Sequence, residues 1–133
     1  MTEPGRALAA PGLSALVSVL LRKEDRLYLN DGMYGIFWEL RFKGHKQFPV
    51  RTYRDGEVLR GETISFQLYG PTCDATDVLP GRVDLAADIR PGDQLEFGQI
   101  GAYSLSGRTR FNGFYSDQVV EFTDPSAEPP KTL

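Results

Sequence analysis

Closely spaced turn signals divide this chain into short segments and leave little room for a long amphipathic helix. The signals are the dipeptides Pro11-Gly12, Asp31-Gly32, Asp55-Gly56, Arg60-Gly61, Gly70-Pro71, Pro80-Gly81, Pro91-Gly92 and Asn112-Gly113. Glycine adopts positive φ and proline fixes φ, so such pairs initiate turns. Turns at intervals of about eight to twelve residues are typical of β barrels and sandwiches.

The segments between these turns have the composition of strands. Apolar side chains alternate along residues 13–21, and a charged stretch connects this segment to residues 27–29. This pattern predicts a hairpin, although residues 13–21 also fit the apolar stripe of a short helix. The other predicted strands are 34–42, 47–53, 63–69, 95–97, 102–106 and 119–122. We therefore predict an all-β fold, a Greek-key-like barrel or sandwich over residues 13–123, with a disordered, proline-containing tail at 124–133.

Composition restricts the expected partners and compartment. The 18 acidic residues outnumber the 15 Lys and Arg residues, for a formal net charge of −3. This charge disfavours nucleic acid as a partner, and also the alternative of an oligonucleotide-binding barrel, because phosphate contacts need a basic surface. The apolar run 13–21 is too short to span a membrane and follows no basic region, so we expect neither a membrane span nor a secretory signal. The single cysteine cannot form an internal disulfide, and we predict a cytoplasmic protein.

Several kinds of catalytic site lack support in this sequence. His45 and Cys73 are the single histidine and the single cysteine, which argues against a zinc site. The sequence contains no Ser/His/Asp set and no glycine loop of the kind that binds phosphates. We therefore expect no metal.

Four motifs are more specific than the composition. They are Glu3-Pro4-Gly5-Arg6, Leu29-Asn30-Asp31-Gly32-Met33-Tyr34-Gly35, Gly70-Pro71-Thr72-Cys73-Asp74, and Gly101-Ala102-Tyr103 followed by Phe111-Asn112-Gly113-Phe114. Their order and spacing resemble the C-terminal portion of ornithine decarboxylase and its relatives, the fold type III (alanine racemase fold) pyridoxal-phosphate-dependent decarboxylases. The resemblance implies the C-terminal β-barrel domain of a two-domain enzyme. Residues 1–12 would be the remnant of the α/β-barrel end and its link, with the rest of that barrel missing.

The resemblance implies that three residues contact the cofactor, pyridoxal 5'-phosphate. Glu3 would face the pyridine nitrogen and keep it protonated, which makes the ring a stronger electron sink. Arg6 would hold the phosphate, for which a guanidinium fork is well suited, and the Tyr103 hydroxyl would lie beside it. On pattern alone the three residues are a turn glutamate, a surface arginine and a half-buried strand aromatic.

Two adjacent residues match the family's catalytic and substrate-binding positions. Cys73 would return a proton to Cα after decarboxylation, because a polarised thiol titrates near neutrality. Asp74 would bind the distal ammonium of the substrate from across a dimer interface. The structural alternatives are a buried cysteine and an Asx turn or helix cap. The resemblance also implies that Phe111 and Phe114 pack around the pocket and the dimer seam. Asp31 and Tyr34 would be interface residues, and a strand-end turn is the structural alternative for both.

Two departures from the family pattern limit these predictions. None of Lys23, Lys43, Lys46 and Lys131 lies in the context of the family's Schiff-base lysine, so we expect the isolated chain to be inactive. Lys43 also follows Phe42 where eukaryotic-type ornithine decarboxylases have an aspartate. If this lysine pointed inward it would repel a diamino acid.

The predicted function is that of a decarboxylase of basic amino acids. The expected reaction is ornithine to putrescine in polyamine biosynthesis, with Cys73 and Asp74 acting in trans in a homodimer or with a complementary α/β-barrel half. The alternative is a non-catalytic regulatory or dimerisation module that pairs with a full-length decarboxylase.

Overall fold

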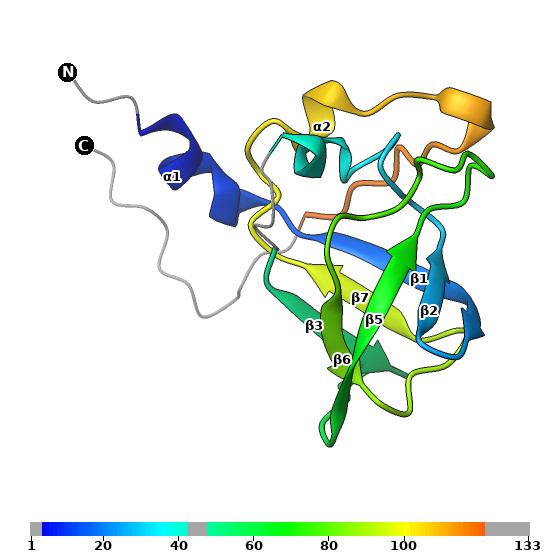
Figure 1. The fold of residues 1–133 in the computed structure, drawn as a ribbon. Coiled ribbons are helices and arrows are strands. Elements are labelled where there is room, and N and C mark those ends of the chain that lie inside the picture. Colours follow the sequence, from blue (N-terminus) through cyan, green and yellow to red (C-terminus); the bar gives the residue numbers. More distant parts are fainter. Residues whose placement is uncertain (1–3, 43–47, 122–133) are drawn as a thin grey trace, which may run out of the picture.

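The described part of the computed structural model, residues 4–42 and 48–121, contains a seven-stranded sheet and a few short helices (Figure 1). The strands are β1 Ala15–Lys23, β2 Arg26–Leu29, β3 Val50–Arg54, β4 Glu57–Val58, β5 Thr63–Tyr69, β6 Val83–Ala86 and β7 Gln94–Phe97. The helices are α1 Gly5–Ala9, η1 Ala10–Gly12, η2 Trp38–Arg41, α2 Ser104–Gly107 and η3 Phe111–Gly113. The predicted all-β class is therefore confirmed.

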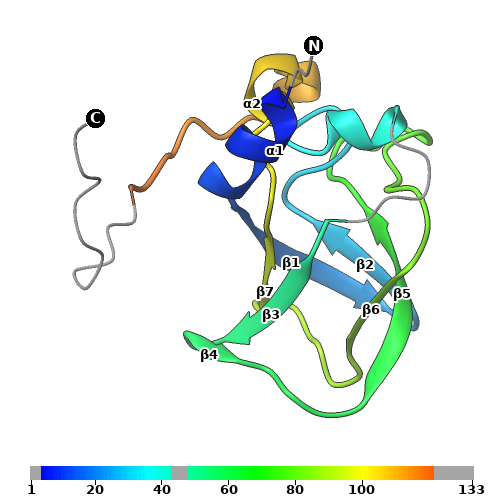
Figure 2. The same cartoon turned by 90° about the vertical axis from the view of Figure 1, so that its left-hand side faces the viewer.

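The sheet curls into a half-barrel. Its strand order is β4-β3-β7-β1-β2-β5-β6, and its pairs are antiparallel except for β2 with β5, which run parallel. Strands β3 and β6, from the two halves of this order, come into contact, so the sheet folds back around one interior (Figure 2).

The predicted hairpin is β1–β2, and its alternation is interrupted once. Val17 and Val19 face the core, but the register shifts between Val19 and Leu21, and Leu21 is exposed. Such a bulge bends a strand and moves the following side chains to the other face. The bend lets β1 pair with β7 through residues 15–18 and with β2 through residues 19–23.

The other strand predictions have mixed outcomes. Strands β3, β5 and β7 confirm the predictions for 47–53, 63–69 and 95–97 within the described residues, whereas β4 and β6 were not predicted. The predictions for 34–42, 102–106 and 119–121 are wrong: these segments form turns with η2, a turn with α2, and an exposed irregular stretch. The tail 124–133 and residue 122 lie outside the described residues, and the boundaries at residues 12 and 123 stay predictions.

The segment 34–42 is not a strand because its apolar side chains follow a helical period. Met33, Ile36, Phe37 and Leu40 are all buried, and their spacing of three and four residues puts them on one side of a helical path. The Phe37 ring packs edge-on against the Phe97 ring, with centroids 4.7 Å apart. This segment therefore closes one end of the half-barrel core.

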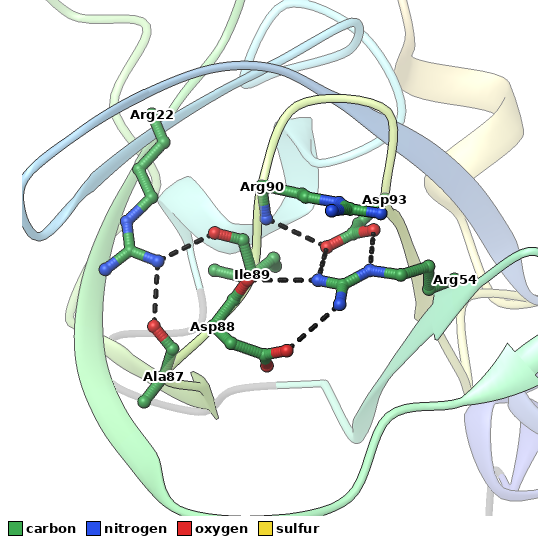
Figure 3. A network of polar contacts seen from close by, with 7 residues as sticks. All are labelled: Arg22, Arg54, Ala87, Asp88, Ile89, Arg90 and Asp93. Carbon is green, nitrogen blue, oxygen red and sulfur yellow. Dashed lines mark hydrogen bonds and ion pairs between the residues drawn. The ribbon is translucent and has the colours of Figure 1, made fainter.

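An arginine network ties the loop between β6 and β7 to two strands (Figure 3). Arg54 on β3 donates from Nε and Nη2 to the Asp93 carboxylate, at 2.8 Å for each bond. Arg22 on β1 donates to the carbonyls of Ala87 and Ile89, at 2.8 and 2.7 Å. These bonds hold the strands at the end of the sheet opposite to η2 and α2 (Figures 1 and 3).

The connections at the other end of the sheet lie together. Figures 1 and 2 show η2, α2 and the loop that follows β5 gathered there, with α1 beside them. We call this part of the molecule, made of residues 30–42, 70–78 and 98–115, the loop end. It carries the predicted site residues that the structure describes, apart from Arg6, which lies on the neighbouring α1.

Candidate functional site

The described site residues form two clusters, and residues 34–41 contribute to both. The first, the Arg6–Tyr103 cluster, also contains Trp38 and Glu39. The second, the Cys73–Asp74 cluster, also contains Tyr34, Arg41, Thr76 and Phe111. Glu3 and Lys43 lie outside the described residues.

The Arg6–Tyr103 cluster is organised around a buried carboxylate. The guanidinium of Arg6, on α1, donates to Oε1 of Glu39, whose side chain is 5% exposed. The hydrogen bond to Glu39 raises the pKa of Arg6 despite some desolvation. The same guanidinium carbon lies 5.2 Å from the centroid of the Tyr103 ring. Glu39 and Tyr103 therefore fix the orientation of Arg6.

Tyr103 occupies a left-handed backbone conformation that Trp38 supports. Its φ is +66°, and its carbonyl accepts a hydrogen bond from Nε1 of Trp38 at 3.2 Å. The indole fits because residue 107 is glycine: a Cβ there would lie 1.8 Å from the Trp38 ring. The Tyr103 side chain remains 59% exposed. This conformation, and not the predicted strand, presents the phenol at the surface.

The donor set of this cluster fits the phosphate of pyridoxal phosphate. Nη1 of Arg6 is buried without a hydrogen-bond partner among the described residues, and it belongs to a cation whose fork geometry suits phosphate. The exposed Tyr103 phenol adds a neutral donor on the same surface. Their position agrees with the predicted cofactor contacts, which stay a prediction.

The loop that carries Cys73 is anchored by Asp77. This carboxylate is buried and accepts hydrogen bonds from the backbone of Met33 at 2.7 Å, and from the backbone and hydroxyl of Thr72 at 3.0 and 2.7 Å. Gly32 and Gly70 make room for it, because a Cβ at either position would lie 2.2 Å from Oδ1 of Asp77. Two of the sequence motifs thus meet at one buried carboxylate.

Cys73 lies at the exposed tip of this anchored loop. Its φ is +60°, and its thiol is exposed, with Sγ 3.9 Å from the carbonyl of Pro71. Positive φ is costly for a residue with a Cβ and persists where the surroundings impose it. The alternative of a buried structural cysteine is therefore excluded, while the catalytic role stays a prediction.

Asp74, the residue after Cys73, is half-buried and is held by Thr76. Its Oδ1 accepts from the backbone N–H of Thr76 at 2.7 Å and from the hydroxyl at 2.6 Å, so the Asx turn considered from sequence is present. These two bonds lower the pKa of Asp74, with smaller contributions from the Tyr34 hydroxyl and the Arg41 charge. Asp74 is thus an anion at neutral pH.

Two stacked aromatic rings lie beside the Asp74 segment. The Tyr34 and Phe111 rings stack with centroids 4.2 Å apart, and the Tyr34 hydroxyl lies 3.1 Å from Oγ1 of Thr76. Nδ2 of Asn112 donates to the carbonyl of Thr72 at 2.9 Å, which fixes the Phe111 segment against the loop. The Phe111-Asn112 motif therefore packs against the Cys73 loop, and its place at the pocket or dimer seam stays a prediction.

Four residues that organise these clusters were not predicted from the sequence: Trp38, Glu39, Arg41 and Asp77. For the first three, the helical period of the buried residues 33, 36, 37 and 40 was the available signal. For Asp77, the two glycines that it contacts lie 38 residues apart in the chain, and their proximity is a tertiary feature.

Residues 4–42 and 48–121 contain neither a cluster of metal ligands nor a membrane-spanning helix. No group of three or more His, Cys, Asp or Glu side chains is placed to hold a metal ion in these ranges. No helix in them combines the length and apolarity needed to cross a membrane.

Comparison with known proteins identifies the family. The family model described as "Pyridoxal-dependent decarboxylase, C-terminal sheet domain" matches residues 13–101. The chain belongs to this family. The match includes the Tyr34 and Cys73–Asp74 motifs, whereas Arg6 and Tyr103 lie outside it.

Individual relatives agree with this assignment. The chain is 36% identical to decarboxylase flvG of Aspergillus flavus, covering 96% of this chain and 34% of that one, and 33% identical to antizyme inhibitor 2 of Xenopus laevis, covering 90% and 29%. Among solved structures, it superimposes on the lysine/ornithine decarboxylase of Vibrio vulnificus in complex with cadaverine, with a TM-score of 0.68, 31% identity, and 85% and 32% coverage.

This decarboxylase domain spans about a third of the length of the relatives it matches. Other relatives are named as lysine/ornithine, ornithine and arginine decarboxylases. The family is pyridoxal-dependent, and solved relatives include a complex with the cofactor.

Proposed function

We propose that this chain is the C-terminal domain of a pyridoxal-phosphate-dependent decarboxylase of basic amino acids, with ornithine as substrate and putrescine as product. The observation that carries the proposal is the loop of residues 70–77. A buried carboxylate anchors the base of the loop, and its tip carries an exposed cysteine followed directly by a half-buried aspartate. The relatives named as ornithine and lysine/ornithine decarboxylases support the substrate class.

The residues of the two clusters have distinct tasks in this proposal. Bound pyridoxal phosphate supplies the electron sink for the electron pair that CO2 loss leaves at Cα. Arg6 and Tyr103 bind the phosphate group, and Glu3 faces the ring nitrogen. Cys73 holds the proton that Sγ delivers to Cα of the product. Asp74, oriented by Thr76, binds the distal ammonium of the substrate.

Cys73 and Asp74 act on a site completed by another polypeptide, in a homodimer or with a complementary α/β-barrel half. At the loop tip Cys73 is exposed and Asp74 is half-buried, so an approaching surface can exclude water from both. Of the four lysines, Lys23 is the one that the structure describes. It lies on β1 with Nζ 5.9 Å from the Tyr28 ring centroid. In this proposal the reactive lysine comes from the barrel domain.

The test uses a holoenzyme that contains this domain together with the family's α/β barrel, on one polypeptide or two. We expect Cys73→Ser to reduce kcat for putrescine formation by roughly a hundredfold, because positioned proton transfer contributes at least that much. Asp74→Asn should raise KM for ornithine and leave turnover of norvaline, which lacks the distal ammonium, unchanged.

The matched control is Asp84→Asn, since Asp84 is an exposed aspartate on β6. This variant should behave like the parent enzyme. Equal activity of all the variants on ornithine would reject the proposed roles of Cys73 and Asp74.

A second candidate function is a regulatory or dimerisation module that pairs with a full-length decarboxylase. The relative named antizyme inhibitor 2 favours it, because its name describes a regulator and not a decarboxylase. Co-purification of this chain with a full-length family member, together with a changed activity of that enzyme, would support the second function. A chain that neither binds nor alters the enzyme would exclude it.

A further inference from the structure

Arg41 holds a defined position beside the Cys73–Asp74 cluster although its side chain is exposed. It ends η2, and its guanidinium carbon lies 4.6 Å from the centroid of the Tyr34 ring, a distance at which a cation is attracted to the ring face. The Tyr34 ring is itself fixed by stacking on Phe111. The Tyr34 backbone is fixed by two bonds of 2.9 Å from Thr109 to its carbonyl.

A short chain of contacts links this cation to the substrate-binding carboxylate. The Tyr34 hydroxyl lies 3.1 Å from Oγ1 of Thr76, and that oxygen lies 2.6 Å from Oδ1 of Asp74. The charge of Arg41 lowers the pKa of Asp74, in addition to the larger contributions of the Thr76 bonds. The carboxylate therefore interacts with a cation of its own domain before any substrate binds.

We propose that Arg41 is a specificity-determining residue that reduces the preference of the site for a distal ammonium and favours a neutral distal group able to donate a hydrogen bond to Asp74. This inference rests on the proposed function, because it concerns the same distal pocket. A carboxylate selects a cationic substrate by charge attraction, and a second cation nearby offsets part of that attraction. A neutral donor such as an amide or ureido group keeps its hydrogen bond to Asp74 and is not repelled by Arg41.

The test compares ornithine with citrulline in the same holoenzyme. The two substrates share a carbon chain and differ in a cationic against a neutral distal group. Arg41→Gln should raise the ratio of kcat/KM for ornithine to that for citrulline by roughly two- to fivefold, the range for charge pairs at exposed sites. The increase should shrink as salt is added.

Two variants serve as controls. Arg41→Lys keeps the charge and should retain most of the parent ratio. Arg60→Leu removes an exposed arginine from the connection between β4 and β5, which lies away from the loop end, and should leave the ratio unchanged. An Arg41→Gln ratio equal to or below that of the parent would overturn the inference.

A second measurement separates this inference from the proposed function. In an NMR titration of the chain, Arg41→Gln should raise the pKa of the Asp74 carboxyl and Arg60→Leu should not. If the holoenzyme decarboxylates neither substrate, the proposed function fails. The titration alone then tests whether Arg41 acts on Asp74. A raised Asp74 pKa then supports Arg41 as a cation that acts on this carboxylate, and an unchanged one overturns the inference.

Discussion

Replacing Asp93 by asparagine should destabilise the fold by a predictable amount. The Asp93 carboxylate is 2% exposed and accepts three hydrogen bonds of 2.8 Å, two from Arg54 and one from the backbone N–H of Arg90 (Figure 3). Asparagine keeps one acceptor oxygen, which in the place of Oδ2 retains two of the donors, and turns an N–H toward the Nε donor of Arg54. Bonds to a charged group contribute about 1.5–3 kcal/mol each, and the partly exposed Arg54 recovers some hydration, so we expect a loss of about 2 kcal/mol.

Thermal unfolding followed by circular dichroism measures this loss. The entropy of unfolding scales with chain length and is about 0.28 kcal/mol/K for a chain of this size, so a loss of about 2 kcal/mol lowers Tm by about 7 °C. The control is Asp88→Asn: Asp88 pairs with the same Arg54 at 3.0 Å, but its side chain is 66% exposed. That variant should lose less than about 0.5 kcal/mol. Equal losses in the two variants would refute the argument from burial.

The same variant has a defined pH dependence. The hydrogen bond from Arg54 lowers the pKa of Asp93 below its usual value of 3.8, against the opposing effect of desolvation. A carboxyl whose pKa is lower in the folded state than in the unfolded state stabilises the native protein at pH values above the unfolded-state pKa. This contribution is lost as the pH falls through the folded-state pKa. The difference in stability between the parent and Asp93→Asn should be constant at neutral pH and shrink below about pH 4. A difference that grows toward low pH would contradict the assignment.

The loop end yields two further predictions. Gly107→Ala should lower the free energy of unfolding by about 1–3 kcal/mol, because the new Cβ would overlap the ring of Trp38. We expect a lower Tm together with a shifted emission maximum of this single tryptophan. Asp77→Asn should loosen the anchored loop, so that iodoacetamide alkylates Cys73 several-fold faster than in the parent; an unchanged rate would show that the three bonds to Asp77 do not hold the thiol in place.

The strands that could be predicted from sequence are those whose pattern is local. Residues 63–69 alternate around Phe66 and Leu68, both buried in β5, and the hairpin of β1 and β2 is preceded and followed by turn signals. The interpretation of 34–42 as a strand was wrong, because its aromatic residues suggested alternation while the buried positions followed a helical period. Composition and alternation alone do not distinguish these two periods in a short apolar segment.

The residues of the candidate site also divide into those that could be predicted from sequence and those that could not. Arg6, Cys73, Asp74 and Tyr103 could be selected from sequence because each lies in a short motif. Nothing local indicated that Glu39 would bind Arg6, or that Arg41 would stack on Tyr34 and influence Asp74. These residues come into contact because residues 34–41 run across the end of the half-barrel.

The amino-acid sequence by itself determined the β class, the turns and the family of this domain, because turn residues, alternation and motifs act over a few neighbouring positions. The tertiary structure decided the parallel pairing of β2 with β5, the two clusters at the loop end and the anchoring of the Cys73 loop by Asp77. Those features depend on contacts between segments that are far apart in the chain. Such contacts form only when the sheet curls and brings its connections together at one end.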